Sequence, residues 1–236
     1  MPSLTPGAAP GRQSDPVALG HVLRAVRPLL PHEFHAARTM PLLFGVLLGT
    51  VLCAAAPAFL QPPDPSGAVT LLRFAAVLGG LGLAFVLDDP ASDMTAVCPS
   101  PCWLRRLLRV IGGLMVLTAV WWLDIALLMM ALPDDARSAL PLADLAAECL
   151  IVALVAVALT LVGLRLTRGL GGGLLGGAGV VLFAVALAVL PAEAAFYAQP
   201  DDVRGWAESL PRWRLLGAVA LSTTVFLLPR QPSGKS

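Results

Sequence analysis

Six long apolar stretches, separated by short polar segments rich in Pro, Gly, Asp and Arg, dominate the pattern of this chain. A helix needs about 20 predominantly apolar residues to cross roughly 30 Å of hydrocarbon. The last stretch is uninterrupted only from Leu215 to Leu228, so Arg212, Trp213 and Arg214 would have to snorkel at its edge. The pattern predicts six membrane-spanning helices, near residues 40–60, 69–87, 107–132, 145–164, 170–190 and 212–229.

Composition agrees with a membrane protein. The 236 residues are 57% hydrophobic and 13% charged, whereas soluble domains are about 45–50% apolar. A net charge of +1 without a basic stripe excludes a nucleic-acid partner. Lys235 is the only lysine, and Ala, Gly and Leu dominate, which is typical of a bacterial protein from a GC-rich genome. We expect an all-α protein with a tail and interfacial helix (1–39), a six-helix transmembrane domain (40–229) and a second tail (230–236).

The arginines predict the orientation, because cytoplasmic loops carry an excess of basic residues. With an even number of spans and the N-terminus inside, eleven basic residues are cytoplasmic: Arg12, Arg24, Arg27, Arg38, Arg105, Arg106, Arg109, Arg165, Arg168, Arg230 and Lys235. Five lie outside: Arg73, Arg137, Arg204, Arg212 and Arg214. We therefore expect a multi-pass protein of the bacterial plasma membrane, with both termini in the cytoplasm.

Residues 17–30, VALGHVLRAVRPLL, have the pattern of an amphipathic helix. The face opposite the apolar one holds His21, Arg24 and Arg27, so the helix would lie on the inner leaflet with Arg toward anionic headgroups. The alternative is a loosely attached tail.

The polar stretch LDDPASDMTAVCPSPCWLRRLL, residues 87–108, falls between the second and third spans. Pro90 ends one helix, Pro99 and Pro101 fix a bend, and Trp103 marks re-entry at headgroup level. This combination predicts a compact cytoplasmic protrusion that a partner can grip.

After the fifth span, PAEAAFYA and DDVRGWAESL each predict a short helix on the outer face. Together with the six spans, the N-terminal helix and the protrusion, this layout resembles the permease subunits of ABC exporters of the type-two, G-subfamily-like fold. The resemblance implies that the protrusion docks on a separate ATPase, which binds ATP and Mg, and that the outer helices cap the exit path. It assigns the docking role to Asp88, Asp89, Asp93, Arg105 and Arg106. A second permease copy or a paralogue is implied as well.

Among the charged residues of the predicted spans, three stand out because they lie inside the bilayer: Arg73, Asp124 and Glu148. Charges inside a bilayer are costly, so they default to functional hypotheses. Pairing Arg73 with Asp124 or Glu148 would relieve the cost. The cluster is either an outer-side gate or a structural ion pair, with snorkelling of Arg73 and Glu148 to the headgroups as a further alternative.

Glycines recur every four residues in RGLGGGLLGGAG, at Gly169, Gly173 and Gly177, so one face of the fifth span can approach another helix closely. That face is either a dimer seam or pore lining, or an ordinary packing face within one chain.

No motif predicts an enzyme, a metal site or a nucleotide site. The terminal GKS lacks the earlier glycine and following helix of a phosphate loop. Cys98 and Cys102 lack further ligands, and cytoplasmic thiols stay reduced. Every His lies before the spans. We therefore expect a permease subunit that exports a hydrophobic or amphipathic cargo, has no cofactor of its own and contacts membrane lipid; the alternative is a standalone membrane scaffold or sensor.

Overall fold

A computed structural model describes residues 39–59, 64–88, 102–167, 171–191 and 194–229. Within these ranges the chain is helical and contains no strand. The helices are α3 (Met40–Ala54), α4 (Ala56–Phe59), α5 (Pro65–Val86), α7 (Cys102–Ala131), α8 (Asp134–Ser138), α9 (Leu142–Leu166), α10 (Gly172–Ala188) and α11 (Val203–Leu227). The predicted interfacial helix at 17–30 lies outside the described residues.

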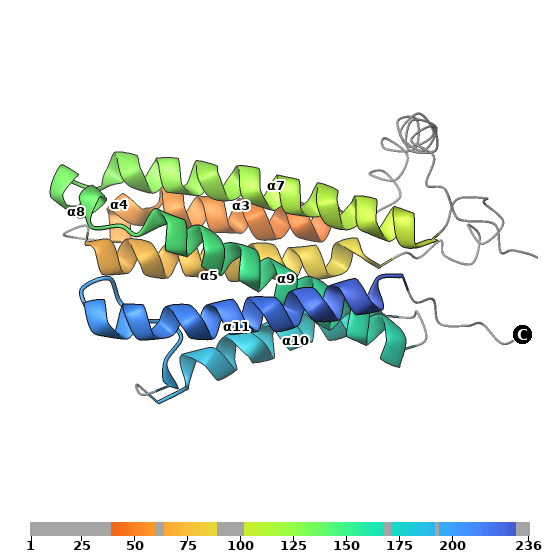
Figure 1. Cartoon of the computed structure of the whole chain (residues 1–236). Helices are drawn as coiled ribbons and strands as arrows, with labels where there is room; N and C mark the ends of the chain where they lie inside the picture. The colour runs from red at the N-terminus through yellow and green to blue at the C-terminus, as the bar shows by residue number, and fades with distance from the viewer. Residues whose placement is uncertain (1–38, 60–63, 89–101, 168–170, 192–193, 230–236) are drawn as a thin grey trace, which may run out of the picture.

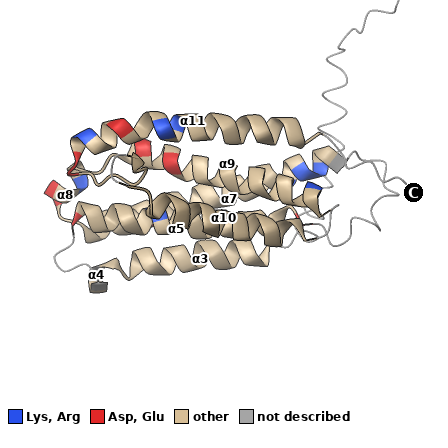
Figure 2. Ribbon diagram, turned by 90° about the horizontal axis from the view of Figure 1, so that it is seen from below, with Lys and Arg blue, Asp and Glu red and all other residues tan. Residues whose placement is uncertain are grey.

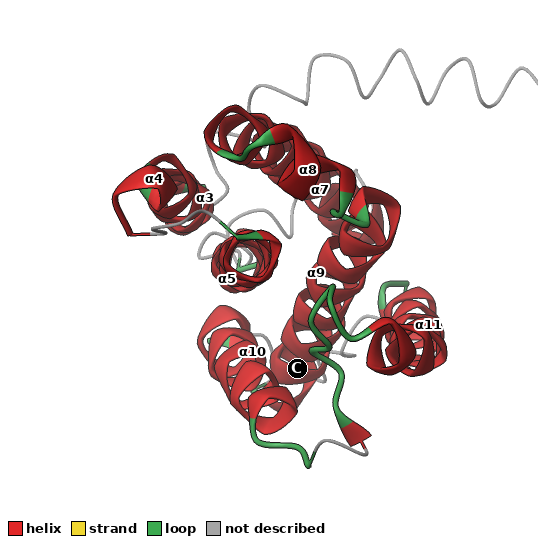
Figure 3. Ribbon diagram, turned by 90° about the vertical axis from the view of Figure 1, so that its left-hand side faces the viewer, coloured by secondary structure: helices red, strands yellow, loops and turns green. Residues whose placement is uncertain are grey.

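The longer helices α3, α5, α7, α9, α10 and α11 form an antiparallel bundle (Figure 1). The start of α3 and the end of α11 lie together at one end, which we call the terminal end. The opposite end carries α4, α8 and the segment between α10 and α11, and we call it the α8 end. Viewed along the bundle, α5 stands between α3, α7, α9 and α10 and packs against all four (Figure 3).

A helix occurs in each of the six predicted apolar stretches, which confirms the all-helical fold. Among the described residues, three helices are long and apolar enough to cross a membrane: α5, residues Trp103–Ala131 of α7, and α9. The apolar helices α3 and α10 are shorter, at 15 and 17 residues. With about 1.5 Å of rise per residue they are about 22 to 26 Å long, a little less than the hydrocarbon thickness.

The segment before the last helix differs from the sequence prediction. DDVRGWAESL is not a separate helix: it is the first part of α11, which starts after an Asp202 cap and continues through Pro211. PAEAAFYA forms no α-helix in its described residues. Its carbonyl oxygens accept hydrogen bonds from side chains instead of from the next helical turn: Ala195 from Arg212, Phe196 from Trp213 and Ala198 from Arg73. These tertiary bonds replace the helical ones.

Glycines bring the helices into backbone contact. A methyl group at Gly82 of α5 would lie 2.6 Å from Leu42 Cα of α3, so these two helices touch without intervening side chains. On α10, Gly173 faces Asp88, which follows the end of α5, and Gly177 faces Phe85 of α5. Gly176 faces Thr160 of α9, and α10 is therefore wedged between α5 and α9. Gly169 of the predicted packing face lies outside the described residues.

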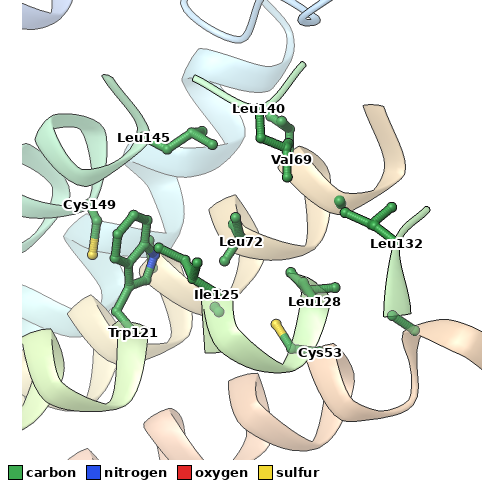
Figure 4. Close-up of a cluster of buried hydrophobic side chains, with 14 of the residues drawn as sticks. Cys53, Val69, Leu72, Trp121, Ile125, Leu128, Leu132, Leu140, Leu145 and Cys149 are labelled. Atoms are coloured by element: carbon green, nitrogen blue, oxygen red, sulfur yellow. The ribbon is translucent and has the colours of Figure 1, made fainter. Parts of the chain in front are cut away.

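The largest buried cluster fills the α8 end of the bundle between α3, α5, α7 and α9 (Figure 4). Leu72, Trp121, Ile125 and Leu128 converge there with the free thiol of Cys53. This apolar interior surrounds the buried charges described below. An unpaired charge there would cost much free energy, so the stability of the bundle depends on how these charges are paired.

The glycine contact on α10 can be tested with two matched substitutions. In Gly176→Ala the new methyl group would lie 2.8 Å from Thr160 Cα, which is backbone and cannot move aside. In Gly179→Ala, on the same helix, its nearest neighbour would be Leu159 Cδ1 at 3.2 Å, the end of a flexible side chain. We expect Gly176→Ala to lower the unfolding free energy in lipid micelles by about 1–3 kcal/mol and Gly179→Ala to have little effect. Equal effects of both would show that α9 and α10 are not in close contact.

Candidate functional site

Arg73 of α5 and Glu148 of α9 form a buried, two-pronged ion pair. Arg73 Nε donates to Glu148 Oε2 at 2.8 Å, and Arg73 Nη2 donates to Oε1 at 3.0 Å. The two side chains are 10% and 4% exposed. Arg73 lies eight residues into α5, about 12 Å from its start by helical rise. Parallel guanidinium–carboxylate bonds of this kind are the geometry that best offsets the desolvation of two charges.

A third bond ties the ion pair to the segment between α10 and α11. We call its described residues 194–202 the cap segment. Arg73 Nη1 donates to the carbonyl oxygen of Ala198 at 2.8 Å. The guanidinium carbon also lies 5.1 Å from the ring centroid of Tyr197 and 5.3 Å from that of Trp206, within cation–π range. One arginine therefore contacts α9, α11 and the cap segment together.

Further side chains of α11 hold the cap segment in place. Arg212 donates to the Ala195 carbonyl at 2.7 Å, and Trp213 Nε1 donates to the Phe196 carbonyl at 3.0 Å. Trp206 Nε1 donates to Asp144 Oδ2 at 3.0 Å, which joins α11 to the first turn of α9. The cap segment is thus fixed over the α8 end by its carbonyl oxygens.

Tyr197 stands in the cap segment against the ion pair. Burial raises the pKa of its phenol; the Arg73 guanidinium opposes this rise and the Glu148 carboxylate adds to it. The phenol therefore stays neutral at physiological pH and faces Arg73 with its ring.

Two hollows flank Arg73. The smaller is lined by Leu72, Trp121, Glu148 and Cys149 among others and leaves about 10 Å³ for the centre of a water molecule, which is about enough for one water. The larger is a groove of about 230 Å³ between α5 and α10. Its walls are mostly apolar, with Phe74, Val77, Ala184 and Ala188, and polar groups are contributed by Thr70, Tyr197 and Gln199 as well as Arg73.

Asp124 does not join this ion pair. Its side chain lies on α7 beside the Thr50 hydroxyl of α3, and the residue is 2% exposed. Among the described residues no hydrogen-bond partner reaches its Oδ1 atom. The three charges predicted as one cluster therefore occupy two places, with Arg73 and Glu148 in one and Asp124 in the other.

Three of the predicted docking residues, Asp88, Arg105 and Arg106, are described, and they lie at the terminal end in different surroundings. Asp88 Oδ1 accepts a hydrogen bond from the backbone N–H of Gly173 at 2.7 Å, and so caps the first turn of α10. Arg105 is 7% exposed and engaged in other contacts, whereas Arg106 is half-buried. Asp89 and Asp93 lie outside the described residues.

Charged residues gather at the two ends of the bundle, as Figure 2 shows. The terminal end carries Arg105, Arg106, Arg109 and Arg165 beside a single described acid, Asp88. The α8 end mixes both signs: Asp134, Asp135, Asp144, Asp201, Asp202 and Glu208 lie there with Arg137, Arg204, Arg212 and Arg214. In the described part of the chain, no three His, Cys, Asp or Glu side chains come together as a metal site.

Comparisons of the chain with known protein families, with curated proteins and with solved structures find no match.

The Arg73–Glu148 pair yields a stability prediction. In Glu148→Gln the buried guanidinium loses its counter-charge, so we expect a loss of about 3–5 kcal/mol of unfolding free energy. The control is Glu208→Gln, which breaks the exposed pair with Arg204 and should change stability by less than about 1 kcal/mol. The measurement is reversible unfolding in lipid micelles. Similar losses in both variants would contradict a desolvated pair.

Proposed function

We propose that this chain is the membrane-spanning permease subunit of an ATP-driven exporter that carries a hydrophobic or amphipathic cargo. One observation carries the proposal: the described residues form a bundle of six longer antiparallel helices, and the end of α5 and the start of α7 lie at the same arginine-rich end as both ends of the described chain. That layout is the one implied by the resemblance to type-two ABC exporter permeases. All six helices then cross the membrane, and the bilayer thins slightly around α3 and α10.

The arginine-rich terminal end faces the cytoplasm in this proposal, since basic residues accumulate on that side. Both chain termini then lie in the cytoplasm, the protein spans a bacterial plasma membrane, and the α8 end with its cap segment faces outward. A separate ATPase, which binds ATP and Mg, docks on the segment between α5 and α7.

Movement of α5 connects the two ends. ATPase closure displaces the terminal ends of α5 and α7, and α5 carries that displacement to Arg73 at the α8 end. Arg73 bonds both Glu148 and the Ala198 carbonyl. A shift of α5 relative to α9 therefore weakens the hydrogen bond between Arg73 and the cap segment. The cap segment then opens the outward path, and its three carbonyl bonds close the path again when α5 returns.

The cargo follows from the exposed side chains. Large apolar residues of α3 and α7 point away from the bundle, among them Phe44, Leu47, Met115 and Trp122. A second copy of the chain, or a paralogue, covers part of this surface, and a hydrophobic or amphipathic cargo moves between the two permeases. Lipid, toxic drugs and secreted natural products belong to that class.

The test is purification of the tagged full chain from its native host in mild detergent. We expect an ATP-binding-cassette ATPase in the eluate, identified by mass spectrometry and by ATP hydrolysis. Arg106→Glu combined with Asp89→Arg should abolish its recovery, because these residues belong to the predicted docking region. We choose Arg106 and not Arg105 because Arg105 is buried and its substitution would disturb the fold.

The control places charge reversals at the other end, with Asp135→Arg and Arg204→Glu, both exposed at the α8 end. These should leave recovery of the ATPase unchanged. If wild type recovers no ATPase, the permease proposal fails and a standalone scaffold or sensor replaces it. If both double variants lose the ATPase equally, the docking region is wrong.

A further inference from the structure

The unpaired carboxyl of Asp124 is the least expected group in the bundle. It lies seven residues before the end of α7, about 10 Å from that end by helical rise, and it is 2% exposed. Its Oδ1 atom has no hydrogen-bond partner in the described part of the chain, and its carboxyl group lies beside the Thr50 hydroxyl. An ionised carboxylate in such a place needs a cation or several donors to offset its lost hydration.

The helices packed around Asp124 supply no free cation among their described residues. On α3 the titratable group is the thiol of Cys53, and on α9 the thiol of Cys149 lies within electrostatic reach. Arg73 is the charged residue of α5, and its guanidinium is bound to Glu148 and to the Ala198 carbonyl. Within α7, Arg109 is fifteen residues away, which is about 22 Å along the helix.

The Thr50 hydroxyl has an acceptor within its own helix. Thr50 Oγ1 donates to the carbonyl oxygen of Val46 at 3.0 Å. A hydroxyl has one hydrogen, so while this bond is kept Thr50 acts toward Asp124 only as an acceptor. An ionised carboxylate is also only an acceptor. With the Val46 bond in place, the two groups can therefore bond only if the shared hydrogen belongs to Asp124.

We propose that Asp124 is a proton-binding site, in which the neutral carboxylic acid donates its proton from Oδ2 to the Thr50 hydroxyl. Oδ1 is then the carbonyl oxygen of a neutral acid, which is cheaper to leave without a partner than a carboxylate oxygen. The bound proton joins α7 to α3. When it leaves, it passes to water as a hydronium ion and leaves the carboxylate behind.

Proton release requires water at Asp124, and in the packed arrangement of α3 and α7 the residue is 2% exposed. The packed arrangement therefore holds one proton more than an arrangement in which α3 and α7 have separated. By linkage, a higher pH favours the separated form. This conclusion does not depend on the proposed transport function.

Infrared spectroscopy of the full chain in lipid nanodiscs tests the site directly. The difference spectrum between wild type and Asp124→Asn at neutral pH should show the carbonyl stretch of a protonated acid in wild type, shifted in heavy water. Carboxylate bands there would overturn the proposal. The matched control is the exposed Asp135→Asn, whose difference spectrum should show carboxylate bands. In Thr50→Val the acid band should persist at a higher frequency; an unchanged frequency would refute Thr50 as the acceptor.

Thermal unfolding provides a second readout. The Tm of wild type relative to the variant should change with pH in opposite directions for a neutral acid and for an ionised carboxylate. Asn can donate its amide hydrogen to Thr50 as the acid does, so Asp124→Asn should match wild type at low pH. As pH rises, wild type should lose Tm relative to the variant, because the unfolded chain releases the proton that the folded chain keeps. Loss of wild-type Tm on acidification, relative to the variant, would overturn the proposal.

If Asp124→Asn does not fold, wild type labelled with ¹³C-aspartate replaces the comparison. The other described aspartates lie at the two ends of the bundle. Among the described aspartates, an isotope-shifted acid band that persists at neutral pH then belongs to Asp124, and its absence refutes the site.

Discussion

The bundle depends on one constraint: a full positive charge inside an apolar interior must be neutralised and hydrogen-bonded in place. Arg73 meets this constraint with two bonds to Glu148 and one to a backbone carbonyl. Each partner comes from a different part of the chain, on α9 and in the cap segment. The cost of an unpaired buried guanidinium is therefore what holds these distant segments in register.

Hydrogen bonds to backbone carbonyls explain why the cap segment is irregular. A run rich in Ala such as AEAAFYA would normally favour a helix. In this chain Arg73, Arg212 and Trp213 take the carbonyl oxygens that a helix would use. Local propensity is weaker than three tertiary bonds in a site that excludes water, because an unsatisfied donor there would cost more than the helix gains.

The helices themselves were predictable, since apolar runs of about 20 residues and the Pro and Gly breaks between them are local signals. The choice between Asp124 and Glu148 as the partner of Arg73 was not. Both are carboxylates at similar depth, and only the packing of α5 against α9 decides between them. The same holds for α11: DDVRGWAESL was predicted to be a separate short helix, but the helix continues through Pro211 because the Asp202 cap and the contacts of Trp206 and Trp213 fix both sides. The capping role of Asp88 also depends on a neighbour, Gly173, that lies 85 positions further along the chain.

That last contact, between Asp88 and Gly173, links the end of α5 to the start of α10 at the terminal end. The Asp88 carboxylate holds the start of α10 by one bond of 2.7 Å, and Asp88 is itself the second residue of the polar stretch 87–108. Any partner that pulls on this segment acts on two helices at once: on α5 through the covalent chain and on α10 through the carboxylate. Of these two links, the single hydrogen bond is the weaker one.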